Sequence, residues 1–501
     1  MRIGRNLAAG LASSIWTALI GLAVIPLYVR YLGKEGYGLI GFLATAQALV
    51  QILDLGLSTS VNREIARESE AGGGWSHAPA LLRTVATIYW VIAAGIALAV
   101  LALAHFIANH WLHAEGMASG DVVLAVALIG VVIACRWPAQ LYQSVLMGAQ
   151  RIVLASVLNI ATVTLASGAV VFVLAFVSPS VAAFLLWQAC VYLAYTLAAR
   201  AMGWRVIGRE QARLDRNELK RLWRFSAGVT AITICGIVLG QLDKLVLSKM
   251  LSLSEYGQYM IAFALAGTLY LFTLPLFNAV YPRFSGLVQS RDAAGLSHIY
   301  RLSTRLLSTI LFPIAMLLSV FPEELIRAWT GDRGLAEAVG PLVPILAAGT
   351  ALHGLMYVPF ALQLAHGTTR LPLTIYAVLL AIATPLTVVL VFSYGALGGA
   401  LAWLTLHSLY LVLGTWMTRR QLLKELDLRW LALDICLPVA TSTLAGLFAR
   451  ALSAAGELGL YARLACGAGW ALVAFLVAFM ASPELRNAAL RMARGAAFRI
   501  L

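Results

Sequence analysis

The chain has 501 residues, of which 61% are apolar and only 12% are charged, and its mean hydropathy is +0.86. Average proteins carry about 25% charged residues, so this composition excludes a water-soluble globular protein. The formal net charge of +14 does not indicate nucleic-acid binding, because the basic residues fall in short gaps between apolar runs and not on a polar face or arm. The sequence therefore predicts a polytopic, all-α membrane protein.

Fourteen apolar runs are long enough to cross a membrane, because a helix needs about 20 apolar residues to span the hydrocarbon core. In chain order they cover residues 7–29, 38–61, 81–104, 121–145, 152–177, 180–202, 225–248, 257–281, 302–321, 341–364, 371–393, 396–417, 431–452 and 459–481. The first run follows Arg2 and Arg5, as the apolar core of a signal peptide does, but it is too long for one and many similar runs follow it. We expect it to be the first span.

Lys and Arg are distributed unevenly between the gaps. With the N-terminus in the cytoplasm and the flanking ends of the spans included, the inside gaps hold 27 of them and the outside gaps hold 7. Cytoplasmic loops of membrane proteins carry an excess of Lys and Arg, so both termini are expected in the cytoplasm. The gap at 205–224 is predicted to be a basic cytoplasmic linker, an amphipathic helix that lies against anionic headgroups.

The sequence is similar to itself at an offset of about 219 residues: Tyr37-Gly38 matches Tyr256-Gly257, and 148–151 matches 367–370. Each repeat holds six spans, an even number, so the halves are expected to be parallel and related by an axis along the membrane normal. This predicts an N-terminal six-helix half at 1–204, the linker at 205–224, a C-terminal six-helix half at 225–418, two extra helices at 431–481 and a basic cytoplasmic tail at 482–501. Two such halves around a cavity are typical of an alternating-access transporter.

Four segments resemble one known family. They are 51–66 (QILDLGLSTSVNREIA), 241–259 (which begins QLDKL and ends EYGQY), 329–331 (WTG) and 365–370 (AHGTTR). They are similar to the polysaccharide transporters, or lipid-linked oligosaccharide flippases, of the multidrug/oligosaccharidyl-lipid/polysaccharide (MOP) superfamily, and the resemblance covers nearly the whole chain. It implies a MATE-like fold in a bacterial inner membrane.

The resemblance also implies the substrate. It is an undecaprenyl-diphosphate-linked oligosaccharide, moved from the cytoplasmic to the periplasmic leaflet for O-antigen, exopolysaccharide or capsule synthesis. A polysaccharide polymerase and glycosyltransferases are the expected partners. A diphosphate that crosses the bilayer needs fixed cations, because an uncompensated charge in hydrocarbon is costly.

Arg136 and Lys244 are the two basic residues that remain inside predicted spans once those near the span ends are counted with the gaps. Arg136 precedes Pro138 and is expected either to bind the diphosphate or a sugar acid, or to form a structural ion pair with Asp54 at a similar depth. Lys244 either binds substrate or extends to the interface. Further substrate-binding candidates ring the expected cytoplasmic mouth, where topology alone also explains them: Arg63, Arg83, Arg305 and Arg370, with Arg301 beside them.

Coupling to an H⁺ or Na⁺ gradient is expected to use a carboxylate within the spans. Asp54 and Asp243 are the candidates, and Asp54 is alternatively only the partner of Arg136. Asp243 and Lys244 are neighbours in sequence, so they are not expected to face each other on a helix. His353 and His407 are either proton relays or packing residues. No cofactor or metal is expected, because the five cysteines are scattered through apolar runs.

Two other functions stay open. A cation-coupled multidrug exporter of the MATE family is the alternative within transport, although such exporters commonly have twelve spans and acidic cavities. A membrane-embedded glycan polymerase or ligase is the alternative from another class, and the absence of long periplasmic gaps in the sequence argues against it.

Overall fold

The computed structural model describes residues 2–71, 75–208, 216–424, 429–456 and 458–493. These residues form helices joined by short turns, with one isolated β-bridge between His113 and Ser252. The expected all-helical architecture is therefore confirmed. The chain divides into two compact units, Met1–Gly257 and Gln258–Leu501.

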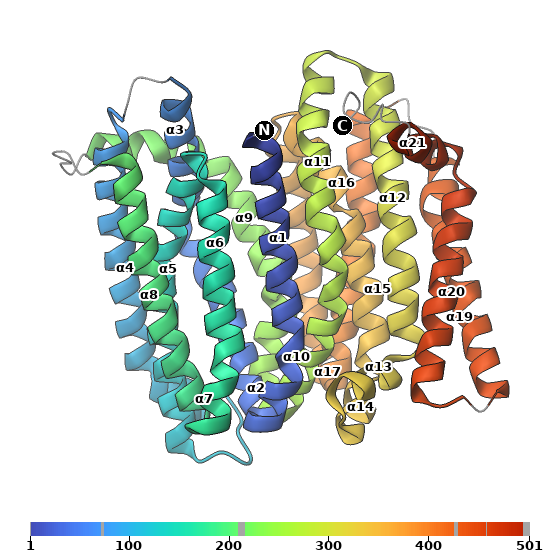
Figure 1. Ribbon diagram of the computed structural model, residues 1–501, viewed down its shortest axis with the longest axis horizontal. Helices are drawn as coiled ribbons and strands as arrows, with labels where there is room; N and C mark the ends of the chain where they lie inside the picture. Colours follow the sequence, from blue (N-terminus) through green and yellow to red (C-terminus); the bar gives the residue numbers. More distant parts are fainter. Residues whose placement is uncertain (1, 72–74, 209–215, 425–428, 457, 494–501) are drawn as a thin grey trace. The chain divides into compact units, whose positions relative to one another are not determined.

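The first unit is built from long apolar helices, several of which lie side by side in Figure 1. Local sequence sets their ends: the Ser180 hydroxyl caps α8 by accepting a hydrogen bond from the N–H of Ala183, and Gly208 ends this helix with a φ of 86°. The elements are α1 (Arg2–Ala23), α2 (Ile25–Val50), η1 (Gln51–Asp54), α3 (Leu57–Ala71), α4 (Ala78–Phe106), η2 (Ile107–Trp111), α5 (Ser119–Gly148), α6 (Ile152–Val163), η3 (Thr164–Ala169), α7 (Val170–Phe176), α8 (Val181–Ile207), α9 (Arg216–Met250) and the start of α10 (Leu253–Ala266). Most of the predicted basic linker at 205–224 has side chains outside the described part of the chain.

Two interruptions shape the start of this unit. Helical geometry breaks inside α2 at Gly33, whose φ of 71° and ψ of −178° suit a residue without a Cβ. The predicted span 38–61 is also interrupted, because Leu55 and Gly56 have φ values of 47° and 73° between η1 and α3. The expectation of one continuous helix there is wrong, and Asp54 lies at the end of a 3₁₀ turn instead of in mid-helix.

The two repeat-matched glycines meet each other. A Cβ on Gly38 of α2 would collide with the backbone carbonyl of Leu253 in α10, and a Cβ on Gly257 would collide with the carbonyl of Lys34 and lie 3.0 Å from the Gly38 nitrogen. Glycine is required here because two helix backbones approach closely. Tyr256 beside this crossing shares a 2.9 Å hydrogen bond with the hydroxyl of Thr45.

The second unit is also helical. Gly331 ends α13 with a φ of 74°, and the Asp332 carboxylate then caps α14 by accepting a hydrogen bond from the N–H of Leu335 at 3.0 Å. The elements are the rest of α10, η4 (Gly267–Leu269), α11 (Tyr270–Gln289), α12 (Ala293–Val320), α13 (Pro322–Thr330), α14 (Arg333–Val339), α15 (Leu342–Leu355), α16 (Tyr357–Ala365), α17 (Arg370–Leu422), α18 (Arg429–Leu431), η5 (Ala432–Cys436), α19 (Leu437–Ala455), α20 (Leu460–Met480) and α21 (Pro483–Ala493).

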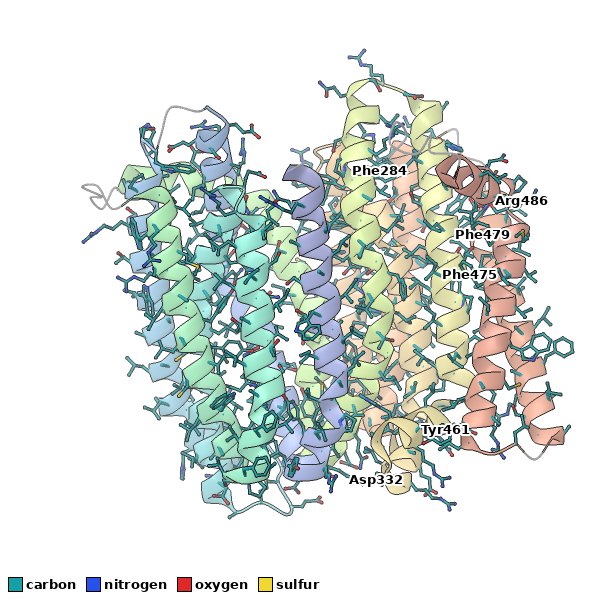
Figure 2. The ribbon with its side chains drawn as sticks, viewed as in Figure 1. Phe284, Asp332, Tyr461, Phe475, Phe479 and Arg486 are labelled. Atoms are coloured by element: carbon teal, nitrogen blue, oxygen red, sulfur yellow. The ribbon has the colours of Figure 1, made fainter. Side chains whose placement is uncertain are left out.

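The last two long helices, α19 and α20, pack against each other and against α12. Met316 of α12, Ala445 of α19 and Ala474 of α20 form the buried core of this contact. Figure 2 shows α20 running from Tyr461 at one end to Phe475 and Phe479 near the other. The rings of these two phenylalanines, one helical turn apart, stack with centroids 5.9 Å apart.

Twelve helical segments of the described chain are long and apolar enough to cross a membrane, so the structure confirms a multi-pass membrane protein. Residues 8–23 form a further, shorter apolar helix. The predicted spans 371–393 and 396–417 lie together in the 53-residue α17, which is interrupted at Gly395 with a φ of 55°.

Candidate functional site

Arg136 lies on α5, two residues before the intrahelical Pro138, and its side chain is exposed. Its Nη1 donates a hydrogen bond to Gln47 Oε1 of α2 at 2.6 Å. Its guanidinium also lies over the ring of Tyr192 of α8, 4.9 Å from the ring centroid, which is within cation–π range. Arg136 is thus an accessible cation held between three membrane helices, and its planar guanidinium has further N–H groups to donate to an oxyanion.

Asp54 is buried, with 7% of its surface exposed. It accepts hydrogen bonds from the backbone N–H of Ser58 at 3.3 Å, from the Ser58 hydroxyl at 2.9 Å and from the Tyr89 hydroxyl. Gln140 of α5 reaches the same Ser58 hydroxyl at 3.5 Å. Neutral donors therefore hold this carboxylate.

The alternative ion pair between Arg136 and Asp54 is wrong: these two described residues have different partners. The physical reason is the interruption of the helix at Leu55 and Gly56, after which the Asp54 carboxylate contacts Ser58 in the first turn of α3 and Tyr89. Stacking of the Tyr89 ring on Trp137, with centroids 5.5 Å apart, places aromatic surface beside the carboxylate.

Asp243 and Lys244 on α9 contact each other directly. Lys244 Nζ lies 3.1 Å from both carboxylate oxygens of Asp243, and it also donates to the carbonyl of Gly240 at 3.1 Å. Asp243 and Lys244 are only 3% and 2% exposed. The expectation that these neighbours face apart is wrong, and so is an interfacial position for Lys244. Its long stem folds back over the preceding helical turn, and burial makes an ion pair necessary.

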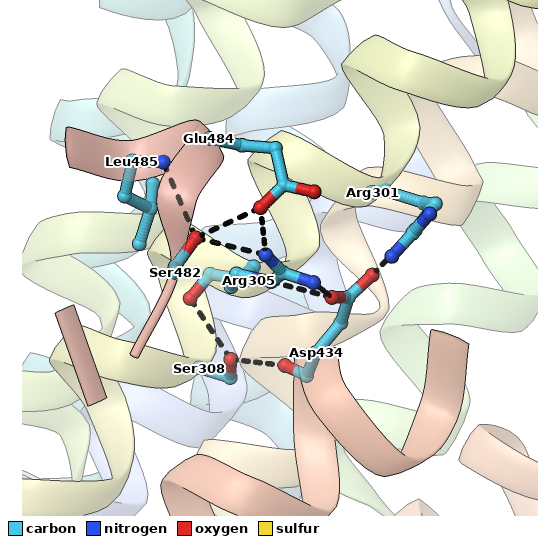
Figure 3. Close-up of polar contacts among 7 residues, drawn as sticks. All are labelled: Arg301, Arg305, Ser308, Asp434, Ser482, Glu484 and Leu485. Atoms are coloured by element: carbon cyan, nitrogen blue, oxygen red, sulfur yellow. Dashed lines mark hydrogen bonds and ion pairs between the residues drawn. The ribbon is translucent and has the colours of Figure 1, made fainter. Parts of the chain in front are cut away.

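Arg305 lies at the centre of an ion-pair network in the second unit, which Figure 3 shows. Its guanidinium pairs with Asp434 of η5 and with Glu484 of α21, and it donates to the Ser482 hydroxyl at 2.8 Å. Arg301 Nε adds a 3.1 Å contact to the second carboxylate oxygen of Asp434. Arg305 is 5% exposed and Asp434 is fully buried, so the network joins α12 to η5 and to α21.

Burial and the neighbouring hydrogen bonds and charge act on the pKa of Glu484 in opposite directions. Partial burial acts to raise it, but the hydrogen bond from its own backbone N–H and the charge of Arg305 together lower the pKa below its ordinary value. A cavity of about 250 Å³ lies beside the network, with His298, Arg301, Arg305 and Glu484 in its wall.

Sequence reasoning assigned no role to Asp434 or Glu484. Asp434 had a detectable signal, a lone carboxylate in the apolar run 431–452, because a buried acid needs a cationic partner. Glu484 had no such signal in the sequence, because it follows the last predicted span and lies among other charged residues.

The remaining predicted substrate residues are exposed arginines in different units. Arg63 of α3 and Arg83 of α4 belong to the first unit, and Arg370 begins α17 of the second. A ring of these side chains around one mouth stays a prediction. Arg83 shares a cavity of about 700 Å³ with Arg200.

His353 of α15 and His407 of α17 are in ring contact within the second unit, with centroids 4.3 Å apart. The Tyr270 hydroxyl shares a 2.6 Å hydrogen bond with His353 Nδ1. His407 Nδ1 lies 2.8 Å from the carbonyl of Trp403, so this nitrogen carries the proton it donates. The two histidines therefore have the hydrogen bonds and ring contact expected of packing residues. Their rings also touch, as those of a proton relay would.

Two sequence comparisons each match more than half of the chain. A family model described as polysaccharide biosynthesis protein matches residues 3–288. The chain is 22% identical over 435 residues to a protein named putative O-antigen transporter from Shigella flexneri, with 85% of this chain and 98% of that protein covered.

Two solved structures illustrate the fold. The chain is similar to lipid II flippase MurJ in an inward closed conformation, with a TM-score of 0.68, 11% identity, and 94% of this chain and 98% of that chain covered. It is also similar to an inward-facing MATE multidrug resistance transporter of the MOP superfamily, with a TM-score of 0.66, 13% identity, and 84% and 99% covered. At these identities the similarity shows a shared fold alone, the MATE-like fold that the sequence predicted.

Proposed function

The chain belongs to the polysaccharide biosynthesis protein family, and from this premise we propose that it is a flippase of undecaprenyl-diphosphate-linked oligosaccharide. It moves this lipid from the cytoplasmic to the periplasmic leaflet of a bacterial inner membrane for surface polysaccharide synthesis. The observation that carries the proposal is Arg136, an exposed cation held among three helices of a membrane-spanning unit.

Arg136 supplies the positive charge that a diphosphate needs in a bilayer, since charge-assisted hydrogen bonds to a planar guanidinium are strong and directional. Gln47 and Tyr192, which already contact Arg136, add an amide and an aromatic face of the kind that sugars bind. Exposed Arg63 and Arg370 attract the anionic headgroup toward the protein. Arg305 contributes less to this attraction than the sequence predicted, because Asp434 and Glu484 already neutralise it.

The transport cycle is alternating access between two parallel six-helix halves, followed by two additional helices, with both termini in the cytoplasm. Breaks at Gly33 and Gly395 support fourteen crossings, because each divides a continuous helical element where the sequence places a gap between spans. The crossing of the repeat-matched Gly38 and Gly257 supports an internal two-fold relation, because each glycine packs on the backbone of the other's helix.

Coupling to an H⁺ or Na⁺ gradient uses the buried carboxylates Asp54 and Asp243. Asp243 has a specific means of coupling because its carboxylate neutralises Lys244 at 3.1 Å. Protonation of Asp243 would remove that neutralisation and free the ammonium to move toward an anionic substrate. The Asp54 carboxylate accepts hydrogen bonds from Tyr89 and Ser58. Protonation of Asp54 would weaken these hydrogen bonds and allow the backbone between η1 and α3 to change conformation.

A cation-coupled multidrug exporter is the second candidate, favoured by the shared fold of the MATE transporter. Cation export requires an accessible carboxylate, whereas the candidate coupling carboxylates Asp54 and Asp243 are buried and Arg136 is an exposed cation. A polymerase or ligase has less support, because a relative that matches 85% of this chain is named putative O-antigen transporter.

The test is the sidedness of the lipid-linked oligosaccharide in cells depleted of this protein. A membrane-impermeant probe of the sugar is applied to spheroplasts and to inverted vesicles. We expect the lipid to accumulate on the cytoplasmic leaflet and re-expression to reverse this. Normal display outside the depleted cells would refute the flippase function, and a simultaneous loss of drug efflux would establish the exporter.

Arg136→Ala and Arg136→Lys then test the site. Arg333→Ala, at an exposed position of α14, is the matched loss of an arginine elsewhere. Loss of a charge-assisted hydrogen bond corresponds to about 1.5–3 kcal/mol, so Arg136→Ala should slow translocation by about 10- to 150-fold. Arg136→Lys should retain part of the rate, and Arg333→Ala should retain all of it. Full transport by both Arg136 variants at normal protein level would rule out the ligand role.

A further inference from the structure

A cavity of about 700 Å³ lies in the first unit among α4, α5 and α8, three helices that lie together in Figure 1. Arg83, Thr87 and Trp90 of α4 line it together with Arg200 and Trp204 of α8. Tyr142 of α5 forms the remaining polar part of its wall and accepts a 3.2 Å hydrogen bond from Trp90 Nε1. This cavity is separate from the contacts of Arg136.

The cavity is positively charged. Two guanidiniums reach it from different helices, both are exposed, and no acidic side chain is in its lining. Among the described residues, no ion pair joins Arg83 or Arg200 to a carboxylate. Two unneutralised arginines in one cavity attract an anion with several oxygens, because guanidinium groups bind phosphate with parallel hydrogen bonds.

The depth of the cavity matches a lipid headgroup. Arg83 is the sixth residue of α4 and Arg200 is seven residues before the end of α8, which places them about 8 and 10 Å from these helix ends at 1.5 Å per residue. That depth is the boundary between headgroups and hydrocarbon. Trp90 and Trp204 are half-buried in its wall, and tryptophan is enriched at this boundary.

Apolar side chains continue from the cavity toward the membrane centre. On α4, Val91 is 66% exposed and Leu98 is 67% exposed; on α8, Leu197 is 46% exposed and Leu193 is 40% exposed. This surface is suited to acyl chains. Apart from the arginines, Thr87, Trp90, Trp204 and Tyr142 are the polar side chains of the lining, and carboxamides, which commonly bind sugars, are absent from it.

We propose that this cavity binds the phosphate headgroup of an anionic glycerophospholipid, with Arg83 and Arg200 as its ligands. Basic pockets between membrane helices at the cytoplasmic side are suited to anionic headgroups. The lipid bridges α4 and α8 and stabilises the first unit. This assigns Arg83 to a resident lipid in place of the transported substrate, and the assignment holds whether or not the protein is a flippase.

The test uses the purified full-length protein, delipidated and then supplied with phosphatidylglycerol, phosphatidylcholine or undecaprenyl diphosphate. Native mass spectrometry measures bound lipid and thermal unfolding measures stabilisation. We expect one phosphatidylglycerol to bind at least tenfold more tightly than phosphatidylcholine and to raise the unfolding temperature. Equal binding of the two glycerophospholipids would overturn the proposal.

Variants assign the binding to this cavity. Arg83→Ala with Arg200→Ala should weaken phosphatidylglycerol binding at least tenfold and abolish the thermal shift. Replacing both by lysine, which keeps the charges, should preserve most of the binding and controls for folding. Arg205→Ala is the matched control, since Arg205 is exposed on the same end of α8 but outside the lining, and it should bind as the unaltered protein does.

Two results would refute the assignment. Retention of phosphatidylglycerol by the double alanine variant would place the lipid elsewhere. Selective loss of undecaprenyl diphosphate binding in that variant, with phosphatidylglycerol unaffected, would make the cavity a substrate site. Both readouts are independent of transport, so failure of this proposal is distinguishable from failure of the flippase function.

Discussion

Replacing Asp434 by alanine is expected to destabilise the second unit more than any loss of an exposed ion pair. Asp434 is fully buried and pairs with Arg305, which is itself 5% exposed. Its removal leaves the Arg305 guanidinium inside the protein with Glu484 as its remaining carboxylate partner. The cost therefore comes mainly from the cation that stays behind.

The magnitude follows from burial. Breaking a buried ion pair by removing one partner costs about 3–5 kcal/mol. Glu484 still neutralises part of the charge, so the lower end applies, about 3 kcal/mol or a roughly 150-fold change in the unfolding equilibrium. The half-buried Arg301, whose side chain is 35% exposed, adds at most about 1 kcal/mol.

The assay is equilibrium unfolding of the purified protein in detergent micelles. Arg333→Ala is the matched control, because it breaks the exposed pair with Glu337 and should change the free energy of unfolding by less than about 1 kcal/mol. Arg305→Met combined with Asp434→Leu should recover most of the stability lost in Asp434→Ala, since it leaves no buried charge unpaired. A loss in Asp434→Ala as small as that in Arg333→Ala would refute the reasoning.

Three further outcomes are expected. Since the pKa of Glu484 is lowered in the folded protein, its stabilising contribution is complete above the ordinary value of 4.5 and is lost as pH falls through the folded pKa. Glu484→Gln should flatten this part of the pH profile of unfolding, and an unchanged profile would contradict the ion pair between Glu484 and Arg305. Gly38→Ala should lower the free energy of unfolding by about 1–3 kcal/mol by overpacking a helix crossing. Gly95→Ala, with open space around its Cβ position, should be neutral or stabilising by up to about 1 kcal/mol, and equal effects of the two substitutions would refute the close approach at Gly38. Tyr89→Phe should cost about 1–3 kcal/mol because buried Asp54 loses a donor, and a shift within error would show that this hydrogen bond contributes nothing.

Segment-level features were predictable from the sequence. Apolar runs and the gaps between them predicted the gap at 394–395, and the structure places a helix break at Gly395. The internal similarity paired Gly38 with Gly257 as equivalent positions, but it did not predict the contact that the structure shows between them. The gap at 394–395 was predictable because it depends on local composition, which each segment carries in its own residues.

Partners of charged residues were not predictable in the same way. Asp54 and Arg136 have similar predicted depths, yet Asp54 is held by Tyr89 and Arg136 by Gln47. The deciding feature is the pair of positive φ values at 55–56. Hydropathy does not detect it, because hydropathy reports side-chain polarity and not backbone conformation, and neither Leu55 nor Gly56 is polar.

The sequence by itself determined that this protein is an all-helical, multi-pass membrane protein of the polysaccharide biosynthesis protein family, because hydropathy and family motifs are properties of single segments. Only the tertiary structure decided which charges are neutralised and which stay accessible. Arg305 and Arg83 are both single arginines near the ends of apolar runs, but packing of α12 against η5 and α21 encloses Arg305 with two carboxylates, whereas Arg83 lies exposed beside Arg200. The free energy of a buried charge depends on the groups that surround it in space, and residues 129 and 179 positions away along the chain supply the groups around Arg305.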